Sequence, residues 1–252
     1  MFLSHEDLKL NYGVDMEIGR FLVDRPVPPD NAYWRKRLLY LNFLPGYLFI
    51  PLFADIQYRL GLPKSELMSD HYMKFVESIL DSAGRQELDG LSMDDHIHEC
   101  LELTRTVSRN PGFLQDLIHY FKGERALTTV ELGSAFPALE RADAYLFTLC
   151  YFSFDEALKK KLVAAWYALI TYFLLVDDME DIRKDFVKKE ENSLLESGLS
   201  KEGADKIIAM LDRDFDVMDE INPVLANRID FTRKKKNVHA IIESFMKEQP
   251  KV

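Results

Sequence analysis

Four aspartates in the C-terminal half of the chain have the residue type and spacing to bind a metal ion. Asp177, Asp181 and Asp185 follow one another at intervals of four residues, and Asp178 precedes Asp181 by three. On a helix this spacing places carboxylates along one side, where like charges repel one another. A cation would stabilise such a row, and Mg²⁺ is the natural candidate because it prefers oxygen ligands. The alternative is a solvated acidic helix end whose charge is offset by neighbouring lysines and arginines.

A long apolar segment leads into these aspartates. From Ser153 to Lys188 the chain contains no Pro or Gly, and hydrophobic residues recur at three- and four-residue intervals. This pattern predicts one long helix. Ser153 and Glu156 have the spacing of a capping box, so we expect the helix to begin there. Residues 164–176 are apolar nearly all round, which is typical of a helix in the middle of a bundle.

This part of the chain resembles a known enzyme family. The segment from Phe154 to Asp185 is similar to the late helices of the trans-isoprenyl diphosphate synthases, in which a long apolar helix ends in an aspartate-rich motif. The four aspartates occupy the acidic positions of that motif, which here reads DDxxDxxxD, and Phe173 matches the aromatic residue before it. The segment from Glu131 to Ala135 resembles a small-residue helix that lies earlier in the family.

The resemblance implies an all-α bundle similar to the isoprenoid synthase fold. It also implies a Mg²⁺-dependent enzyme that acts on an isoprenyl diphosphate, by prenyl transfer or by terpene formation after loss of the diphosphate. Asp177, Asp178 and Asp181 would be the catalytic, metal-binding residues, with Asp185 in support. Phe173 would contact the substrate, and two further aromatic residues are candidates for the pocket wall or for the core, namely Tyr172 and Trp166.

The family's first aspartate-rich motif lies earlier in its sequences and is followed by paired arginines. The best candidate in this chain is formed by Asp94 and Asp95, which are followed only by Arg105. We include both aspartates in the predicted metal-binding set. Their alternative role is structural, because Ser92 has the spacing of an N-cap and acidic residues stabilise the first turn of a helix.

A basic cluster near the C-terminus is the candidate for binding the phosphates. Arg228, Arg233 and Lys234 are the predicted substrate-binding residues, and Lys235 and Lys236 extend the cluster. Arginine and lysine bind phosphate through charge-assisted hydrogen bonds. The alternative is an ordinary solvated run of charges.

The chain departs from the family pattern at two further places. Leu174 stands where the family usually has Gln, and Thr128 and Thr129 lie where a Lys-Thr pair is found. These departures favour a second hypothesis, a non-catalytic helical bundle derived from the same fold that binds a lipid or a partner protein.

Composition restricts the class of protein. The chain has 252 residues, a hydrophobic fraction of 47% and a net charge of −10, which is typical of an ordinary globular protein and argues against a nucleic-acid binder. We expect one α-helical domain over residues 1–252, with about eight to ten helices at usual helix lengths. Two cysteines imply no disulfide framework, and the N-terminus lacks a signal peptide pattern, so we expect a cytoplasmic protein, with a homodimer as a candidate assembly.

One apolar stretch, from Leu38 to Ile56, invites comparison with a membrane segment. Pro45, Gly46 and Pro51 interrupt it, so we expect a buried, kinked helix pair and no transmembrane segment, with an interfacial patch as the alternative. Residues 1–31 contain several prolines and predict an irregular lead-in. Local capping signals predict further helix starts at these residues: Asn31, Ser65, Ser92, Thr128 or Thr129, and Ser200.

Overall fold

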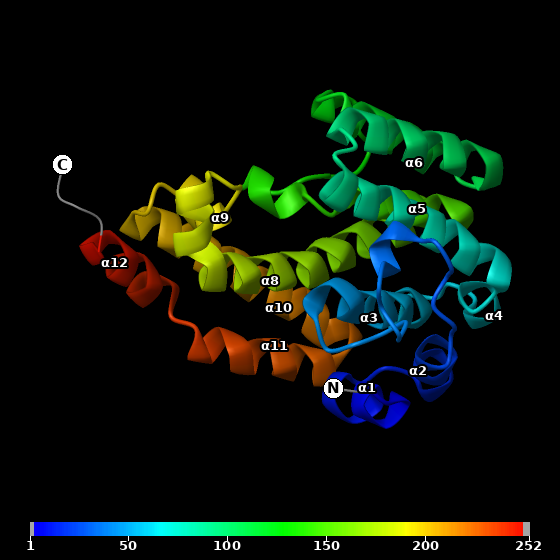
Figure 1. Cartoon of the computed structure of the whole chain (residues 1–252), viewed down its shortest axis with the longest axis horizontal. Helices are drawn as coiled ribbons and strands as arrows, with labels where there is room; N and C mark the ends of the chain where they lie inside the picture. Colours follow the sequence, from blue (N-terminus) through cyan, green and yellow to red (C-terminus); the bar gives the residue numbers. More distant parts are fainter. Residues whose placement is uncertain (1–2, 249–252) are drawn as a thin grey trace. The chain divides into compact units, whose positions relative to one another are not determined.

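The computed structural model describes residues 3–248, apart from the side chain of Thr232. Within this range the protein has twelve α-helices, four 3-10 helices and no strand (Figure 1). The prediction of an all-α protein is therefore confirmed. The α-helices outnumber the eight to ten that we expected, because the N-terminal region and two of the connections contain short helices of their own.

The α-helices are α1 (His5–Tyr12), α2 (Met16–Val23), α3 (Pro45–Arg59), α4 (Lys64–Leu67), α5 (Asp70–Asp89), α6 (Met93–Val107), α7 (Pro111–Phe121), α8 (Glu156–Lys188), α9 (Ser193–Glu196), α10 (Lys201–Ile221), α11 (Pro223–Lys235) and α12 (Val238–Glu248). The 3-10 helices are η1 (Ala32–Trp34), η2 (Arg125–Leu127), η3 (Pro137–Glu140) and η4 (Asp143–Tyr151).

The chain forms two compact units. The first, here called the N-terminal unit, consists of Met1–Leu132 and Asp143–Val163. The second, the C-terminal unit, consists of Gly133–Ala142 and Ala164–Val252. Helix α8 contributes its first turns to the N-terminal unit and its remaining length to the C-terminal unit. A single folding domain over residues 1–252 stays a prediction.

The first part of the expected irregular lead-in is helical, so that prediction is wrong for residues 5–23. Ser4 and Asp7 form a capping box at the start of α1, with the Ser4 Oγ accepting from the Asp7 N–H at 3.0 Å. Gly13 ends the helix in the left-handed conformation, at a φ of 70°. A capping box and a terminal glycine are enough to delimit a helix of two turns.

In the apolar stretch from Leu38 to Ile56, only residues 45–56 are helical, and they belong to one helix and not to the expected pair. Helix α3 begins at Pro45 and carries Pro51 in its interior. Its inner face is fully buried in the N-terminal unit, with Phe53 and Ile56 at 0% exposure. The residues that precede α3 form a loop on the surface, in which Leu38 is 95% exposed.

Two of the α-helix starts that were predicted from capping signals are confirmed. Ser92 caps α6 and Ser200 caps α10, and in each case the Oγ accepts from the N–H three residues later. Asn31 caps η1. Ser65 lies within the short helix α4 and does not begin a long helix. The long helix α5 begins later in the chain and is capped by Ser69.

A buried ion pair contacts the segment around Thr129, which forms a bend, so no helix begins there as predicted. The Asp116 carboxylate accepts from the Thr129 N–H and Oγ1, both at 2.8 Å. The Lys159 Nζ lies 2.9 Å from the same carboxylate. This contact joins α7 to the first turns of α8 within the N-terminal unit.

The C-terminal unit has its own hydrophobic core. Residues of α8, α9, α10, α12 and the η3 segment contribute to it, among them Leu175, Ile182, Leu194, Ile207 and Phe245. The side of α8 that packs in this core is less exposed than the opposite side of the helix.

Helix α8 is the one helix in the described part of the chain that is long and apolar enough to cross a membrane. Of its most apolar window, 72% is buried inside the structure, which is typical of a core helix, so α8 is no clear transmembrane segment. The helix begins at Glu156 and not at Ser153. Asp155 caps it by accepting from the Leu158 N–H at 2.8 Å, whereas the Ser153 hydroxyl donates to the Arg109 carbonyl.

Candidate acidic site on helix α8

The four aspartates of α8 separate into two pairs with different environments. The side chains of Asp177 and Asp181 are 62% and 37% exposed. Asp178 and Asp185, which are seven residues apart and therefore share one face, are 1% and 7% exposed. Only the first pair is open to an ion or ligand from solvent, so the row is less uniform than its spacing suggested.

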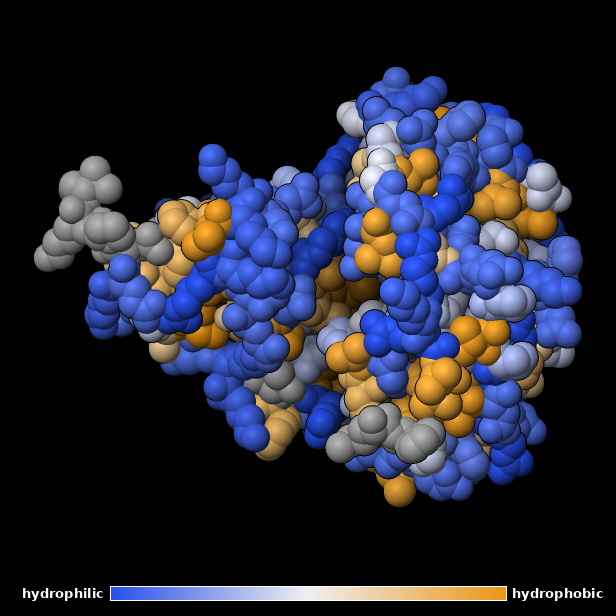
Figure 2. Space-filling model, in the orientation of Figure 1, coloured by the Kyte–Doolittle hydropathy of each residue, from blue (hydrophilic) through white to orange (hydrophobic). Residues whose placement is uncertain are grey.

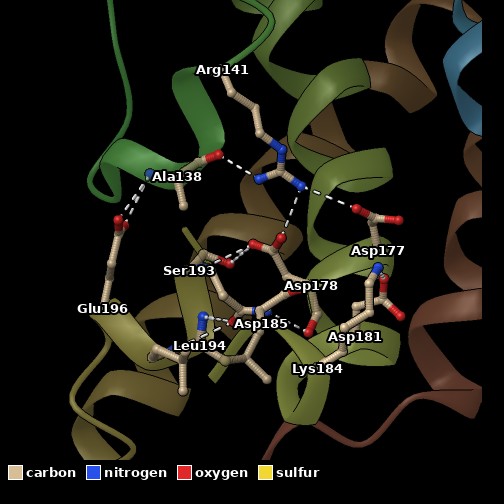
Figure 3. A network of polar contacts seen from close by, with 12 residues as sticks. Ala138, Arg141, Asp177, Asp178, Asp181, Lys184, Asp185, Ser193, Leu194 and Glu196 are labelled. Carbon is tan, nitrogen blue, oxygen red and sulfur yellow. Dashed lines mark hydrogen bonds and ion pairs between the residues drawn. The ribbon is translucent and has the colours of Figure 1, made fainter. Parts of the chain in front are cut away.

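Asp178 lies at the centre of a network that joins three segments of the C-terminal unit (Figure 3). Its Oδ2 accepts from the Ser193 N–H at 2.8 Å and from the Ser193 Oγ at 2.5 Å. Its Oδ1 accepts from the Arg141 guanidinium at 2.9 Å. The carboxylate thus fixes the start of α9 and the end of η3 against α8.

Asp185 supports the same arrangement through Asn192. The Asn192 Nδ2 donates to the Asp185 carboxylate at 2.9 Å and to the Asp178 carbonyl at 2.8 Å. Its Oδ1 caps α9 by accepting from the Leu194 N–H at 3.0 Å. Asp185 therefore orients the amide that begins α9.

Arg141 connects the buried pair of aspartates to the exposed one. Its guanidinium also lies 3.3 Å from the Asp177 carboxylate, and it donates to the Ala138 carbonyl at 2.5 Å. Partial desolvation raises the pKa of Asp177, and the neighbouring carboxylates of the row add to this, whereas Arg141 opposes it. The shift therefore reflects chiefly the partial burial of Asp177 beside other carboxylates.

Part of the basic cluster lies at this acidic helix end. Lys236 contacts Glu180 on α8, and Lys184 of α8 contacts Asp181. The predicted phosphate-binding residues Arg233 and Lys234 instead pair with Asp230 of their own helix, and Arg233 also contacts Asp212 of α10. For these two residues, and for Arg228 on the same helix, binding of substrate stays a prediction.

The aromatic candidates are mostly part of the packed interior. Trp166 is 0% exposed and Phe173 is 8% exposed, while Tyr172 is partly buried, with its ring centroid 5.3 Å from that of Phe173. Burial of this degree is what core residues show. A role for Phe173 in contacting substrate stays a prediction.

Asp94 and Asp95 occupy the first turn of α6 in the N-terminal unit. The Asp95 N–H donates to the Ser92 Oγ at 3.1 Å, and both aspartates are exposed. This is the structural role that the sequence offered as the alternative. Their participation in metal binding stays a prediction.

The exposed aspartates fit Mg²⁺ only as part of a shared site. Among residues 3–248, no group of three or more His, Cys, Asp or Glu side chains is arranged to hold a metal ion. Mg²⁺ in proteins is commonly held by one or two carboxylates, with phosphate oxygens and water completing its coordination. Asp177 and Asp181 supply that number of carboxylates.

Sequence reasoning missed the partners of the buried aspartates. Ser193 and Asn192 follow a polar turn and could have been read as helix caps, which are favoured positions for both residue types. Arg141 carried no signal, because it stands in a mixed segment far from the aspartates. No sequence pattern indicated a role for Glu196 either, whose carboxylate accepts from the Ala138 N–H at 3.0 Å.

A further carboxyl group, Asp214 of α10, is buried without a complete set of partners. Its Oδ2 is buried and has no hydrogen-bond partner within the described structure, and its Oδ1 contacts only the exposed Arg213, at 3.0 Å. Burial raises the pKa of Asp214 to about 6, although Arg213 opposes the shift. The charged form of this carboxyl group therefore destabilises the folded state.

We expect Asp214 to make stability fall as the pH rises through its pKa. In the unfolded chain the pKa of an Asp is about 3.9. Between that pH and about pH 6, the folded state therefore binds more protons than the unfolded chain does. The free energy of unfolding should therefore drop by about 1–3 kcal/mol between pH 4 and pH 7, relative to Asp214→Asn. Urea denaturation of both proteins across this range measures the difference, and parallel curves would contradict it.

The fold and this site together define an all-α protein with a partly buried aspartate row at the end of its longest helix. Comparison of the chain with protein-family models, with curated proteins and with solved structures finds no match.

Proposed function

We propose that the protein is a Mg²⁺-dependent enzyme that binds an isoprenyl diphosphate at the acidic end of α8, in a bundle of the isoprenoid synthase type. The observation that carries the proposal is the position of Arg141, whose guanidinium lies between the carboxylates of Asp177 and Asp178. A guanidinium is suited to bind phosphate through two parallel hydrogen bonds. The carboxylates that would bind a cation therefore lie next to the guanidinium that would bind the phosphate.

The exposed side chains supply the binding groups. Asp177 and Asp181 lie one helical turn apart and are the two carboxylates available to a hydrated cation. Asp178 keeps its position through Ser193 even when Arg141 turns from its Oδ1 toward a phosphate. Lys236, which contacts Glu180, adds positive charge at the same helix end.

Binding of Mg²⁺ together with a diphosphate at this end would place positive charge beside the row. Mg²⁺ bound with the diphosphate would neutralise the charge of the leaving group and so favour its departure. Arg141 and Lys236 would hold the phosphate oxygens, while Asp177 and Asp181 would orient the cation. The apolar part of α8 that precedes the row, which includes Phe173, would accommodate an isoprenoid chain.

The second candidate is a non-catalytic protein that retains the bundle and binds a lipid or a partner. One observation favours it: the internal hydrogen bonds of Asp178 and Asp185 give half of the row a structural task. A chain that had lost catalysis would keep these two aspartates for the stability of α9 and η3.

Thermal unfolding with Mg²⁺ and farnesyl diphosphate tests both candidates. Ligand at 100 times its dissociation constant adds about 2.7 kcal/mol, which for a chain of this size raises the melting temperature by about 5–10 °C. We expect this rise only when both components are present. The double variant Asp177→Ala/Asp181→Ala should abolish it, and Asp219→Ala, which removes an exposed acid of α10, should not.

Release of inorganic diphosphate, measured in the same samples, separates the two candidates. Release by the unaltered chain, lost in the double variant, supports the enzyme. A melting shift without release supports the binding protein. No shift, or an equal shift in the double variant, overturns the proposal that the acidic end of α8 binds this ligand.

A further inference from the structure

A surface loop in the N-terminal unit exposes leucines beside cations. The loop, here called the basic-leucine loop, comprises residues 35–39, which follow η1 and precede α3 in the chain. Leu38 is 95% exposed and Leu39 is 38% exposed, and Leu44 at the start of α3 is 51% exposed. Figure 2 shows that the visible face of the molecule is mostly hydrophilic, with hydrophobic residues gathered in several patches. The apolar side chain of Leu38 is thus almost completely in contact with water, where its burial would be favourable.

The exposure of Leu38 results from a fixed backbone and not from a loose one. Trp34, just before the loop, is 1% exposed, stacks on Tyr40 with centroids 4.6 Å apart and donates from Nε1 to the Tyr40 carbonyl at 2.9 Å. Arg35 forms two hydrogen bonds with the Asp89 carboxylate, at 2.7 and 2.6 Å. Both ends of the loop are thus anchored on buried or paired groups, and the leucines between them project outward.

The backbone of the loop is itself unusual. Lys36 has a φ of 60°, in the left-handed region that a residue with a side chain seldom adopts. Such conformations cost about 1–3 kcal/mol and persist where the surroundings impose them, often at functional positions. This left-handed residue stands two positions before the exposed Leu38.

The cations of the loop are available to a partner. Lys36 and Arg37 are exposed, and within the described residues neither forms an ion pair with a carboxylate. The Arg37 guanidinium lies 5.2 Å from the centre of the Tyr47 ring, which orients it without neutralising it. The chain as a whole has a net charge of −10, so these two free cations beside exposed leucines mark a local preference for an anionic partner.

We propose that the basic-leucine loop docks the protein on anionic lipid bilayers. Leu38, Leu39 and Leu44 enter the boundary between headgroups and acyl chains, and Lys36 and Arg37 contact the phosphates of the headgroups. A bilayer accepts a small projecting tip of this kind without a shaped socket. A stable protein partner would require about 1,000 Å² or more of matched interface, which five projecting residues do not supply.

Sedimentation with lipid vesicles tests the proposal on the full chain. Vesicles of phosphatidylcholine alone are compared with vesicles that contain phosphatidylserine, and we expect binding only to the second kind. Lys36→Glu/Arg37→Glu and Leu38→Ser/Leu39→Ser should each reduce the partition coefficient about tenfold or more. Two matched controls alter exposed residues elsewhere and should bind as the unaltered chain does: Lys160→Glu/Lys161→Glu and Leu127→Ser.

A fluorescence measurement decides the depth of contact independently of these variants. Cys100 and Cys150 are both buried, so a Leu38→Cys variant can be labelled selectively at the loop with an environment-sensitive dye. We expect a blue shift on addition of phosphatidylserine vesicles and none with phosphatidylcholine alone. Absence of binding by the full chain, an equal loss in the control variants, or a dye that stays in water overturns the proposal. Binding of the loop to an acidic protein in place of vesicles would overturn it equally.

Discussion

Replacement of Asp116 by alanine is expected to lower the free energy of unfolding by about 3–5 kcal/mol. The side chains of Asp116 and Lys159 are each 3% exposed, and their charged groups lie 2.9 Å apart. Burial lowers the pKa of Lys159, but Glu156 and Asp116 raise it by more, so the amine keeps its charge. Within the described part of the chain, the carboxylate that remains beside Lys159 without Asp116 is that of Glu156, which is 71% exposed and screened by water. A nearly uncompensated buried charge is among the most destabilising changes known.

Urea denaturation at pH 7 measures the loss. A double variant, Asp116→Ala/Lys159→Met, removes both charges and should recover most of the stability, because an apolar pair avoids the desolvation penalty. Glu190→Ala, which removes the exposed partner of Lys188, is the control and should change stability by less than about 1 kcal/mol. If the double variant is as unstable as Asp116→Ala, loss of the contact with Thr129 and not the unpaired amine is the cause.

Replacement of Asp178 by alanine is expected to cost about 2–4 kcal/mol, whereas Asp177→Ala should cost less than about 1 kcal/mol. The two residues are adjacent and chemically identical, but Asp178 is 1% exposed and accepts from Ser193 and Arg141. Its removal leaves the Ser193 N–H buried without an acceptor and Arg141 without its closest carboxylate. The Asp177→Ala change, in contrast, breaks an ion pair that is in contact with water.

Denaturant unfolding of the two single variants provides the comparison, with Asp178→Asn as an intermediate case that keeps the shape of the side chain. Equal losses for Asp177→Ala and Asp178→Ala would contradict the division of the row into an exposed and a structural pair. The result also decides which variants are informative about function. A variant at Asp178 that loses activity also loses stability, so the tests of ligand binding rely on Asp177 and Asp181.

Several features of the fold were readable from the sequence because the interactions behind them are local. Ser92 and Ser200 cap helices through backbone groups three residues away, and the apolar periodicity of α8 predicted a long buried helix. Where two neighbouring residues could each cap the same helix, the prediction from the sequence was wrong. Ser153 has capping-box spacing to Glu156, yet Asp155 caps α8, because the Ser153 hydroxyl binds the Arg109 carbonyl from a distant part of the chain.

Three consecutive lysines at the start of α8 show where local reasoning ends. Lys159, Lys160 and Lys161 are equivalent in type and nearly in position, yet only Lys159 is buried. The difference arises from Asp116, which lies 43 residues away. No spacing rule within the helix distinguishes an ion-paired lysine from its solvated neighbours.

The sequence by itself determined the all-α class, the starts of α6 and α10 at their serine caps, and the presence of a row of acids at the end of a buried helix. Only the tertiary structure decided which of those acids meet solvent. That choice depends on Arg141, 37 residues before Asp178, and on Ser193, 15 residues after it. The exposure and partners of a side chain are set by the segments that fold against it, whereas helix formation and capping act over a few residues.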